Sequence, residues 1–136
     1  MEILIINGPN LNLLGKRQPS IYGDISFEEY IQEIQKDGIT ISVFQNNVEG
    51  EIINALHNAK VDGIILNAGG YTHTSVAIRD AVSAIETPVV EVHISNISAR
   101  ESFRHESLIS PVAAGCIFGF GMMGYELALD YFKKLI

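Results

Sequence analysis

The sequence predicts an α/β protein built on a doubly wound, five-stranded parallel sheet. Five short runs rich in β-branched residues recur along the chain, and most of them are apolar almost throughout. Such runs suit strands that are covered on both faces, as strands of parallel sheets are. Segments with helical spacing of apolar residues alternate with these runs, and the chain shows no internal repeat, linker or low-complexity tract.

The predicted strands share a core of Val, Ile, Leu or Phe, which favour a pleated and buried surface. In chain order they are EILIING (2–8), ITISVFQ (39–45), VDGIILNA (61–68), PVVEVHIS (88–95) and GCIFGFG (115–121). Each run has the length of an ordinary strand rather than that of a helix.

The predicted helices carry apolar residues on one stripe. In SFEEYIQEIQK (26–36) the stripe is formed by Phe27, Tyr30, Ile31 and Ile34. The others are EGEIINALHNA (49–59), TSVAIRDAVSAI (74–85) and MGYELALDYFKKLI (123–136). The last one has Lys133 and Lys134 near its carboxyl end, where the helix dipole favours cations.

This alternation leaves few topologies, because crossovers between parallel strands are right-handed. The flavodoxin-like strand order 2-1-3-4-5 fits best. In such sheets, ligands bind beyond the carboxyl ends of the strands. The exits of the first, third and fourth predicted strands are the most polar or glycine-rich, so we expect a functional site there.

Length and composition exclude several classes of protein. The chain has 136 residues, 47% of them hydrophobic and 18% charged, which predicts a single globular domain over 1–136. A net charge of −7 makes nucleic acid a poor partner. Cys116 is the only cysteine, so neither an internal disulfide nor a CxxC metal motif exists. The sequence has neither a signal-peptide pattern nor a long apolar run, which predicts a cytoplasmic protein without a membrane partner.

The fourth predicted strand ends in a candidate acid–base pair. Strand alternation puts Glu91, His93 and Ser95 on one face. A histidine at the mouth of a sheet can act as a general acid, and a carboxylate two residues earlier can fix its tautomer. The alternative is a hydrogen-bonded histidine that is only structural.

Glycine and polar residues follow the third predicted strand in NAGGYTHTS. Gly69 and Gly70 allow close backbone approach, and Thr72 or Thr74 can cap the next helix. A capped helix start suits a carboxylate or a phosphate, because it offers free N–H groups and the positive dipole end. His73 lies in this turn, which makes the segment a candidate anion site. A plain turn between strand and helix is the alternative.

Two arginines follow the fourth strand in ISARESFRHES (97–107). Arg100 and Arg104 are four residues apart, so on a helix they would share a face and could clamp a carboxylate. A solvated surface is the alternative. His57 and His105 have no such pattern of partners, and we expect both on the surface.

The segment GKRQPSIYG (15–23) places a guanidinium and a phenol on one loop. A nearby cation favours the phenolate, so Arg17 can lower the pKa of Tyr22 from its ordinary value of about 10 by roughly 1–3 units. Tyr22 could then act as a base. A tyrosine that fills the core beside solvated cations is the alternative.

GFGMMG (119–124) is a GxGxxG sequence, but only 12 residues follow it. A dinucleotide-binding fingerprint needs another strand and an acidic residue further along, so we interpret these glycines as close strand–helix packing.

Four segments that cover nearly the whole chain resemble one family. They are INGPNLNLLGKRQPSIYG, QNNVEGEIINALH, LNAGGYTHTSVAIRDA and PVVEVHISNISARESFRHESLISPVAAGCIFGFGMMGYELAL. Together they are similar to type II 3-dehydroquinate dehydratase. The resemblance implies a flavodoxin-like fold, a homododecamer of four trimers, and the loss of water from 3-dehydroquinate to give 3-dehydroshikimate. It also implies that neither a metal, a cofactor nor a Schiff base is needed.

The resemblance assigns catalytic roles by position. Tyr22 matches the base that takes a proton from the carbon next to the ketone, and Arg17 matches the arginine that lowers its pKa. Asn10 matches the asparagine that holds a water on the enolate oxygen. His93 matches the acid that protonates the departing hydroxyl, and Glu91 matches its neighbouring carboxylate.

The resemblance also assigns the contacts to the substrate. They are Asn67, His73, Ile94, Ser95 and Arg104, with Asp80 reaching the site of a neighbouring subunit. Arg100 matches a second arginine near the loop. Ser98 and Glu106 depart from the pattern, since histidine is common at both positions.

Other flavodoxin-like modules fit less well. A flavin-binding domain needs a phosphate loop rich in Ser, Thr or Gly after its first strand, and NGPNLNLL lacks one. A receiver domain needs acidic residues where Ile6, Asn7 and Asn67 stand. A structural oligomer without activity stays open as an alternative.

Overall fold

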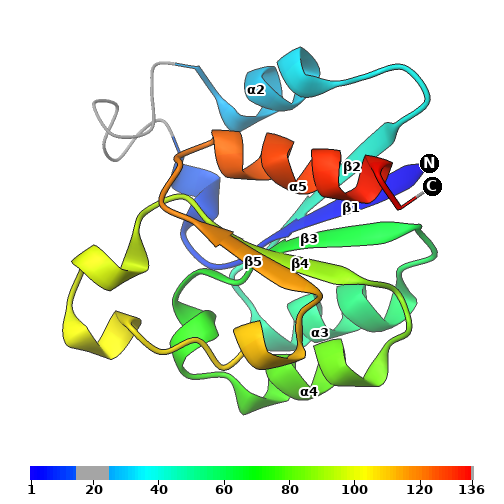
Figure 1. Cartoon of the computed structure of the whole chain (residues 1–136). Coiled ribbons are helices and arrows are strands. Elements are labelled where there is room, and N and C mark those ends of the chain that lie inside the picture. Colours follow the sequence, from blue (N-terminus) through cyan, green and yellow to red (C-terminus); the bar gives the residue numbers. More distant parts are fainter. Residues whose placement is uncertain (15–24, 136) are drawn as a thin grey trace.

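The computed structural model describes residues 1–14 and 25–135. Figure 1 shows one central sheet with helices on both faces. All strand pairs are parallel, and the order is β2-β1-β3-β4-β5, as the sequence predicts. The strands are β1 (Glu2–Asn7), β2 (Thr40–Gln45), β3 (Gly63–Asn67), β4 (Val89–His93) and β5 (Gly115–Phe118).

Two helices cover each face of the sheet. Helices α2 (Phe27–Ile34) and α5 (Met123–Lys133) lie on one face, and α3 (Glu49–Asn58) and α4 (Val76–Ala84) lie on the other (Figure 1). Each element lies where the sequence predicts it and is up to a few residues shorter. Two apolar cores result, one on each face, because alternate residues of a strand point to opposite sides.

The expectation that strands are covered on both faces is confirmed only for the centre of the sheet. Every residue of β3 and β4 is buried. At the edge strands β2 and β5 the expectation is wrong, because the covering helices leave residues of both strands exposed. In β2 three of the six residues are exposed, among them Val43 at 44%.

Local hydrogen bonds set the helix starts. Ser26 and Glu29 form a reciprocal capping box at the start of α2, where Ser26 Oγ accepts from the Glu29 N–H at 3.1 Å. At α4 the cap is Ser75, whose Oγ accepts from the Ile78 N–H at 2.9 Å. The prediction that Thr72 or Thr74 caps this helix is therefore wrong by one residue or more.

The helical face predicted for Arg100 and Arg104 does not form. Short 3-10 turns occupy this region instead, at Ile97–Ala99, Ser102–Arg104 and Ser110–Val112. Side chains take backbone donors that a helix would use: Asn96 Oδ1 accepts from Ser98 N, and Ser107 Oγ accepts from Ile109 N. Such local bonds compete with helix formation.

The glycines after β5 have different roles. A Cβ on Gly124 would lie 3.1 Å from a methyl group of Val92, which agrees with close strand–helix packing. Gly119 and Gly121 instead have φ values of 98° and 62°, a region that favours glycine. Their N–H groups donate to the carbonyls of His93 and Ile94, so this turn holds the end of β4.

Gly8, directly after β1, provides a test of the packing between the ends of β1 and β3. A Cβ there would lie 2.5 Å from the backbone oxygen of Ala68. Because backbone cannot move as a side-chain tip can, we expect Gly8→Ala to lower the free energy of unfolding by about 1–3 kcal/mol. Gly50→Ala in α3 is the control, since its Cβ would meet nothing within 4 Å and alanine favours helices. Chemical denaturation measures both, and a Gly8→Ala variant as stable as wild type would contradict this packing.

Candidate active site

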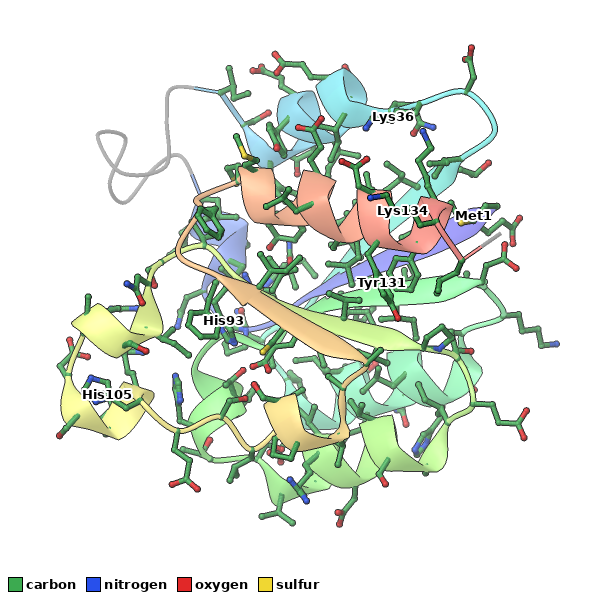
Figure 2. All side chains as sticks on the ribbon, viewed as in Figure 1. Met1, Lys36, His93, His105, Tyr131 and Lys134 are labelled. Carbon is green, nitrogen blue, oxygen red and sulfur yellow. The ribbon has the colours of Figure 1, made fainter. Side chains whose placement is uncertain are left out.

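A pocket of about 290 Å³ lies at the carboxyl ends of the central strands, as expected. Its walls come from the loop after β1, the turn after β3 and the segment after β4. The residues that line it are Pro9, Asn10, Leu11, Leu13, Leu14, Asn67, Gly69, Gly70, His73, His93, Ile94, Ser95, Ile97, Arg100 and Arg104. Figure 2 shows His93 at this end of the sheet, with His105 on the outer loop.

Glu91 and His93 form a buried pair in this wall. Strand alternation puts both on one face of β4, and His93 Nε2 lies 2.6 Å from Glu91 Oε2. His93 is 5% exposed and Glu91 is fully buried, so little water competes for either group. Because Nε2 faces the carboxylate, Nδ1 is the ring nitrogen available to a ligand in the pocket.

Two serines hold the Glu91 carboxylate from the other side. Ser107 Oγ donates to Oε2 at 2.7 Å, and Ser110 Oγ donates to Oε1. Burial alone would raise the pKa of the Glu91 carboxyl, but the hydrogen bonds from His93, Ser110 and Ser107 outweigh it and lower that pKa. The carboxylate is therefore a fixed negative charge beside the imidazole.

His73 lies next to this pair. Its Nδ1 donates to the Glu106 carbonyl at 2.7 Å, and its ring stacks on that of His93 with centroids 6.4 Å apart. Thr72 Oγ1 is 3.4 Å from His93 Nε2. The turn after β3 therefore contacts the predicted acid directly, as the convergence of neighbouring strand ends requires.

Asn67 enters the pocket from the opposite face of the sheet. Its side-chain oxygen accepts from the Gly69 N–H at 3.2 Å, and its nitrogen donates to the Tyr125 hydroxyl at 3.0 Å. Asn67 is 3% exposed. The pocket thus takes polar groups from both faces, with Asn67 on one and His93 on the other.

Asn10 begins the loop after β1 in an uncommon conformation. Its φ of 70° is the only positive value among the described residues other than glycine. Asn10 N donates to Asn47 Oδ1 at 3.1 Å, and Gln45 Nε2 donates to the Gly8 carbonyl at 3.1 Å. The end of β2 therefore holds this turn at the pocket's edge, where such strain is often functional.

Two arginines supply positive charge to a protein that is acidic overall. Arg100 and Arg104 both line the pocket, although they come from separate turns rather than from one helix. Arg100 Nη1 donates to Ser95 Oγ at 3.5 Å, and Arg104 pairs with Glu101. Because Glu101 is exposed, that pair is weak enough to be exchanged for an anionic ligand.

The structure brings most of the predicted site residues together. Those that line the pocket are Asn10, Asn67, His73, His93, Ile94, Ser95 and Arg104, and Glu91 lies directly behind His93. Asp80 is exposed on α4 and does not line the pocket of its own chain. Arg17 and Tyr22 lie outside the described residues. Ser98 is exposed and is not among the lining residues.

Sequence reasoning missed the supporting residues of the site. Ser107 and Ser110 hold Glu91, Asn47 holds Asn10, and Tyr125 holds Asn67. Only Tyr125 carried a local signal, since a tyrosine within a buried helix stripe needs a partner for its hydroxyl.

The lowered pKa of Glu91 predicts how stability changes with pH. The carboxylate contributes its full stabilisation at pH values above 4.5, the ordinary pKa of a glutamate carboxyl. This contribution is lost as the pH falls through the lower pKa of Glu91 in the folded state. We therefore expect the Tm difference between wild type and Glu91→Gln to be largest near neutrality and to shrink below about pH 4.5. Thermal unfolding from about pH 7 to about pH 3 measures it, with exposed Glu51→Gln as control. A difference that is independent of pH would contradict the assignment.

Within residues 1–14 and 25–135, no group of three or more His, Cys, Asp or Glu side chains is placed to hold a metal ion. In the same ranges, no helix has both the length and the apolar character needed to cross a membrane.

Comparisons with known proteins agree with this fold. A family model described as dehydroquinase class II matches residues 1–133. A protein from a species of Exiguobacterium named 3-dehydroquinate dehydratase is 55% identical over 133 residues, which cover 95% of this chain and 92% of that protein. A protein of the same name from Clostridium perfringens is 52% identical over 143 residues, covering 100% of this chain and 98% of that protein.

Solved structures give the same result. The type II dehydroquinase from Butyrivibrio crossotus superposes with a TM-score of 0.85 at 44% identity, covering 98% of this chain and 97% of that one. The type II dehydroquinase from Propionibacterium acnes superposes with a TM-score of 0.87 at 39% identity, covering 98% and 96%. A family model over nearly the whole chain, relatives at more than half identity and this shared fold lead to one conclusion: the chain belongs to the class II dehydroquinase family.

Proposed function

We propose that this chain is a 3-dehydroquinate dehydratase, a hydro-lyase of the shikimate pathway of aromatic amino acid biosynthesis. It removes water from 3-dehydroquinate by trans elimination and gives 3-dehydroshikimate through an enolate intermediate. The observation that carries the proposal is the buried Glu91–His93 pair, with 2.6 Å between Oε2 and Nε2, in the pocket wall. Membership of the class II dehydroquinase family and the names of the relatives support it.

The first step is the removal of a proton from the carbon next to the ketone. Tyr22 is the base, and the charge of Arg17 favours its phenolate. The C–H electron pair moves onto the ketone oxygen and forms an enolate. Asn10, at the pocket's edge, holds the water that donates to this oxygen. Donors placed in advance at a developing oxyanion typically contribute several kcal/mol.

The second step is the loss of the hydroxyl from the carbon one bond further on. The enolate electron pair returns, a C=C bond forms, and the C–O bond breaks. The leaving oxygen takes a proton from His93 and departs as water. Glu91, held by Ser107 and Ser110, stabilises the positive imidazolium before this transfer. Tyr22 then loses its proton to solvent and His93 regains one, which restores the starting state.

The remaining pocket residues bind the substrate. Its carboxylate and ring hydroxyls contact Arg104 and the Ile94–Ser95 segment, and Asn67 and His73 complete the set. Arginine suits a carboxylate because its planar donors match both oxygens. An anionic, polyhydroxylated substrate accounts for a polar pocket with two arginines in a protein of net charge −7.

We also propose that residues 1–136 form a single catalytic domain that works in the cytoplasm as a homododecamer, a tetramer of trimers. Asp80 supports an assembly, because it matches a residue that completes the site of a neighbour and is exposed on α4. Large apolar side chains are exposed on and before α5, including Phe120 at 64% and Met123 at 54%. Contacts between subunits would bury such groups.

A turnover assay tests the proposed function. We expect purified protein to convert 3-dehydroquinate with a rise in absorbance from the conjugated enone. The rate should be insensitive to EDTA, and borohydride with substrate should leave activity intact, because no metal or imine takes part. Figure 2 shows Lys36 and Lys134 toward the Met1 end, away from His93, so neither of these two is placed to form an imine in the pocket. No turnover would refute the function, and inactivation by borohydride would refute the mechanism.

A further inference from the structure

A hydrogen-bonded chain of side chains lies beneath the pocket and connects Asn7, Tyr125 and Asn67. Asn7 and Asn67 are register partners at the carboxyl ends of β1 and β3. The Tyr125 ring comes from α5, is fully buried and packs edge-on against Phe27 with centroids 5.0 Å apart. Its hydroxyl lies 3.0 Å from Asn67 Nδ2 and 2.8 Å from Asn7 Oδ1.

The direction of these hydrogen bonds follows from the Gly69 N–H at one end. The Gly69 N–H can only donate, so the Asn67 atom that faces it at 3.2 Å must be the oxygen. Asn67 Nδ2 therefore faces Tyr125 and donates to its hydroxyl oxygen. The hydroxyl then has its own proton left, which it donates to Asn7 Oδ1. Reversing the Asn67 amide would place its NH₂ group against the Gly69 N–H, so that two buried donors would face each other.

This arrangement decides what Asn67 shows to a ligand. One hydrogen of its NH₂ group is held by Tyr125, and its oxygen is held by Gly69. Because Asn67 lines the pocket, the second hydrogen of that NH₂ group is the one a ligand can bind. Burial raises the pKa of the Tyr125 phenol, so it stays protonated and keeps donating to Asn7.

We propose that Tyr125 is a positioning residue: through its hydroxyl it fixes the amide of Asn67 so that the pocket presents an N–H donor to an oxygen of the substrate. The consequence for turnover rests on the proposed function, in which Asn67 contacts 3-dehydroquinate. The fixed orientation of the amide does not, and it can be measured without any substrate. Tyr125 itself touches no substrate and acts only through Asn67.

A double-mutant cycle with 3-dehydroquinate tests the effect on turnover. Tyr125→Phe keeps the ring and removes one buried hydroxyl, and we expect kcat/KM to fall about tenfold. In an Asn67→Ala background, the same change should cause no further loss, because the group that Tyr125 positions is gone. Tyr131→Phe, a hydroxyl removed from the exposed side of the same helix, should leave kcat/KM unchanged. Equal losses in both backgrounds would overturn the proposal and indicate a structural role.

Proton NMR of the wild-type protein tests the orientation itself and does not depend on a variant that folds. We expect a slowly exchanging Tyr125 hydroxyl proton with a nuclear Overhauser effect to the Asn67 NH₂ group. A rapidly exchanging hydroxyl, or an Asn67 NH₂ group that is close to Gly69 instead, would overturn the proposal. If wild type failed to turn over 3-dehydroquinate, the proposed function would fall, and this spectrum would still decide whether Tyr125 orients Asn67.

Discussion

His93→Ala is expected to lower kcat for 3-dehydroquinate by about 10²–10⁴-fold, the usual contribution of a general acid. Without the imidazole, the hydroxyl must leave without a proton from the protein. Water that enters the space left by the imidazole is a far weaker acid, so it cannot take over this role. Substrate binding should change much less than kcat, since the pocket's arginines remain.

His57→Ala on α3 is the matched control, because His57 is exposed and does not line the pocket. Its steady-state constants should equal those of wild type. If His93→Ala retained a kcat within a few-fold of wild type with an unchanged Tm, the acid would have to be another group. His73, whose ring stacks on His93, would then be the next residue to replace.

Tyr22→Phe is expected to abolish measurable turnover. A phenyl ring cannot take a proton, and general-base catalysis alone contributes about 10²–10⁴-fold. The Arg17 guanidinium would remain but would have no phenolate to stabilise. Steady-state kinetics at high enzyme concentration measures the residual rate, and light scattering shows whether the assembly persists.

Tyr30→Phe controls for the loss of a tyrosine hydroxyl elsewhere. Tyr30 lies on α2 and is half-buried. Burial, followed by the nearby charges of Glu126 and Glu33, raises its pKa to about 12, so it stays protonated near neutrality and no phenolate is available to act as a base. This variant should keep full activity. Wild-type rates in Tyr22→Phe would show that another group removes the proton, and the base assignment would be wrong.

The sequence predicts the sheet well because both faces of its central strands lie in the same apolar environment. Runs such as those at β3 and β4 are buried on both faces, so composition alone identifies them. Once the strands are placed, the crossover rule leaves few orders. Strand ends are less predictable, because local hydrogen bonds determine them. At the end of β4, for example, the N–H groups of Gly119 and Gly121 donate to the carbonyls of His93 and Ile94.

The segment after β4 shows where pattern reasoning fails. Spacing suggests that Arg100 and Arg104 share a helix, yet both reach the pocket from separate 3-10 turns. The side chains of Asn96 and Ser107 decide this, because they accept backbone N–H bonds within the segment. A helical period cannot account for such short-range competition.

The reacting groups of the site are easier to predict than the groups that hold them. Glu91 and His93 can be identified from the sequence as titratable residues at a strand end. Ser107 and Ser110 are ordinary residues in sequence, and Tyr125 shows only that its buried hydroxyl needs some partner. Their partners lie 16 to 58 positions away in the sequence, and no local pattern identifies those partners.

A crystal structure of His93→Ala soaked with 3-dehydroquinate is the most direct test of where the reaction takes place. We expect intact substrate in the pocket between Asn67 and Arg104, with its leaving hydroxyl toward the space of the missing imidazole. Tyr22 Oη should lie within reach of the carbon next to the ketone, with Arg17 beside it. Substrate bound elsewhere, or Tyr22 and Arg17 remote from a substrate in this pocket, would show that the proposed site or its base is wrong.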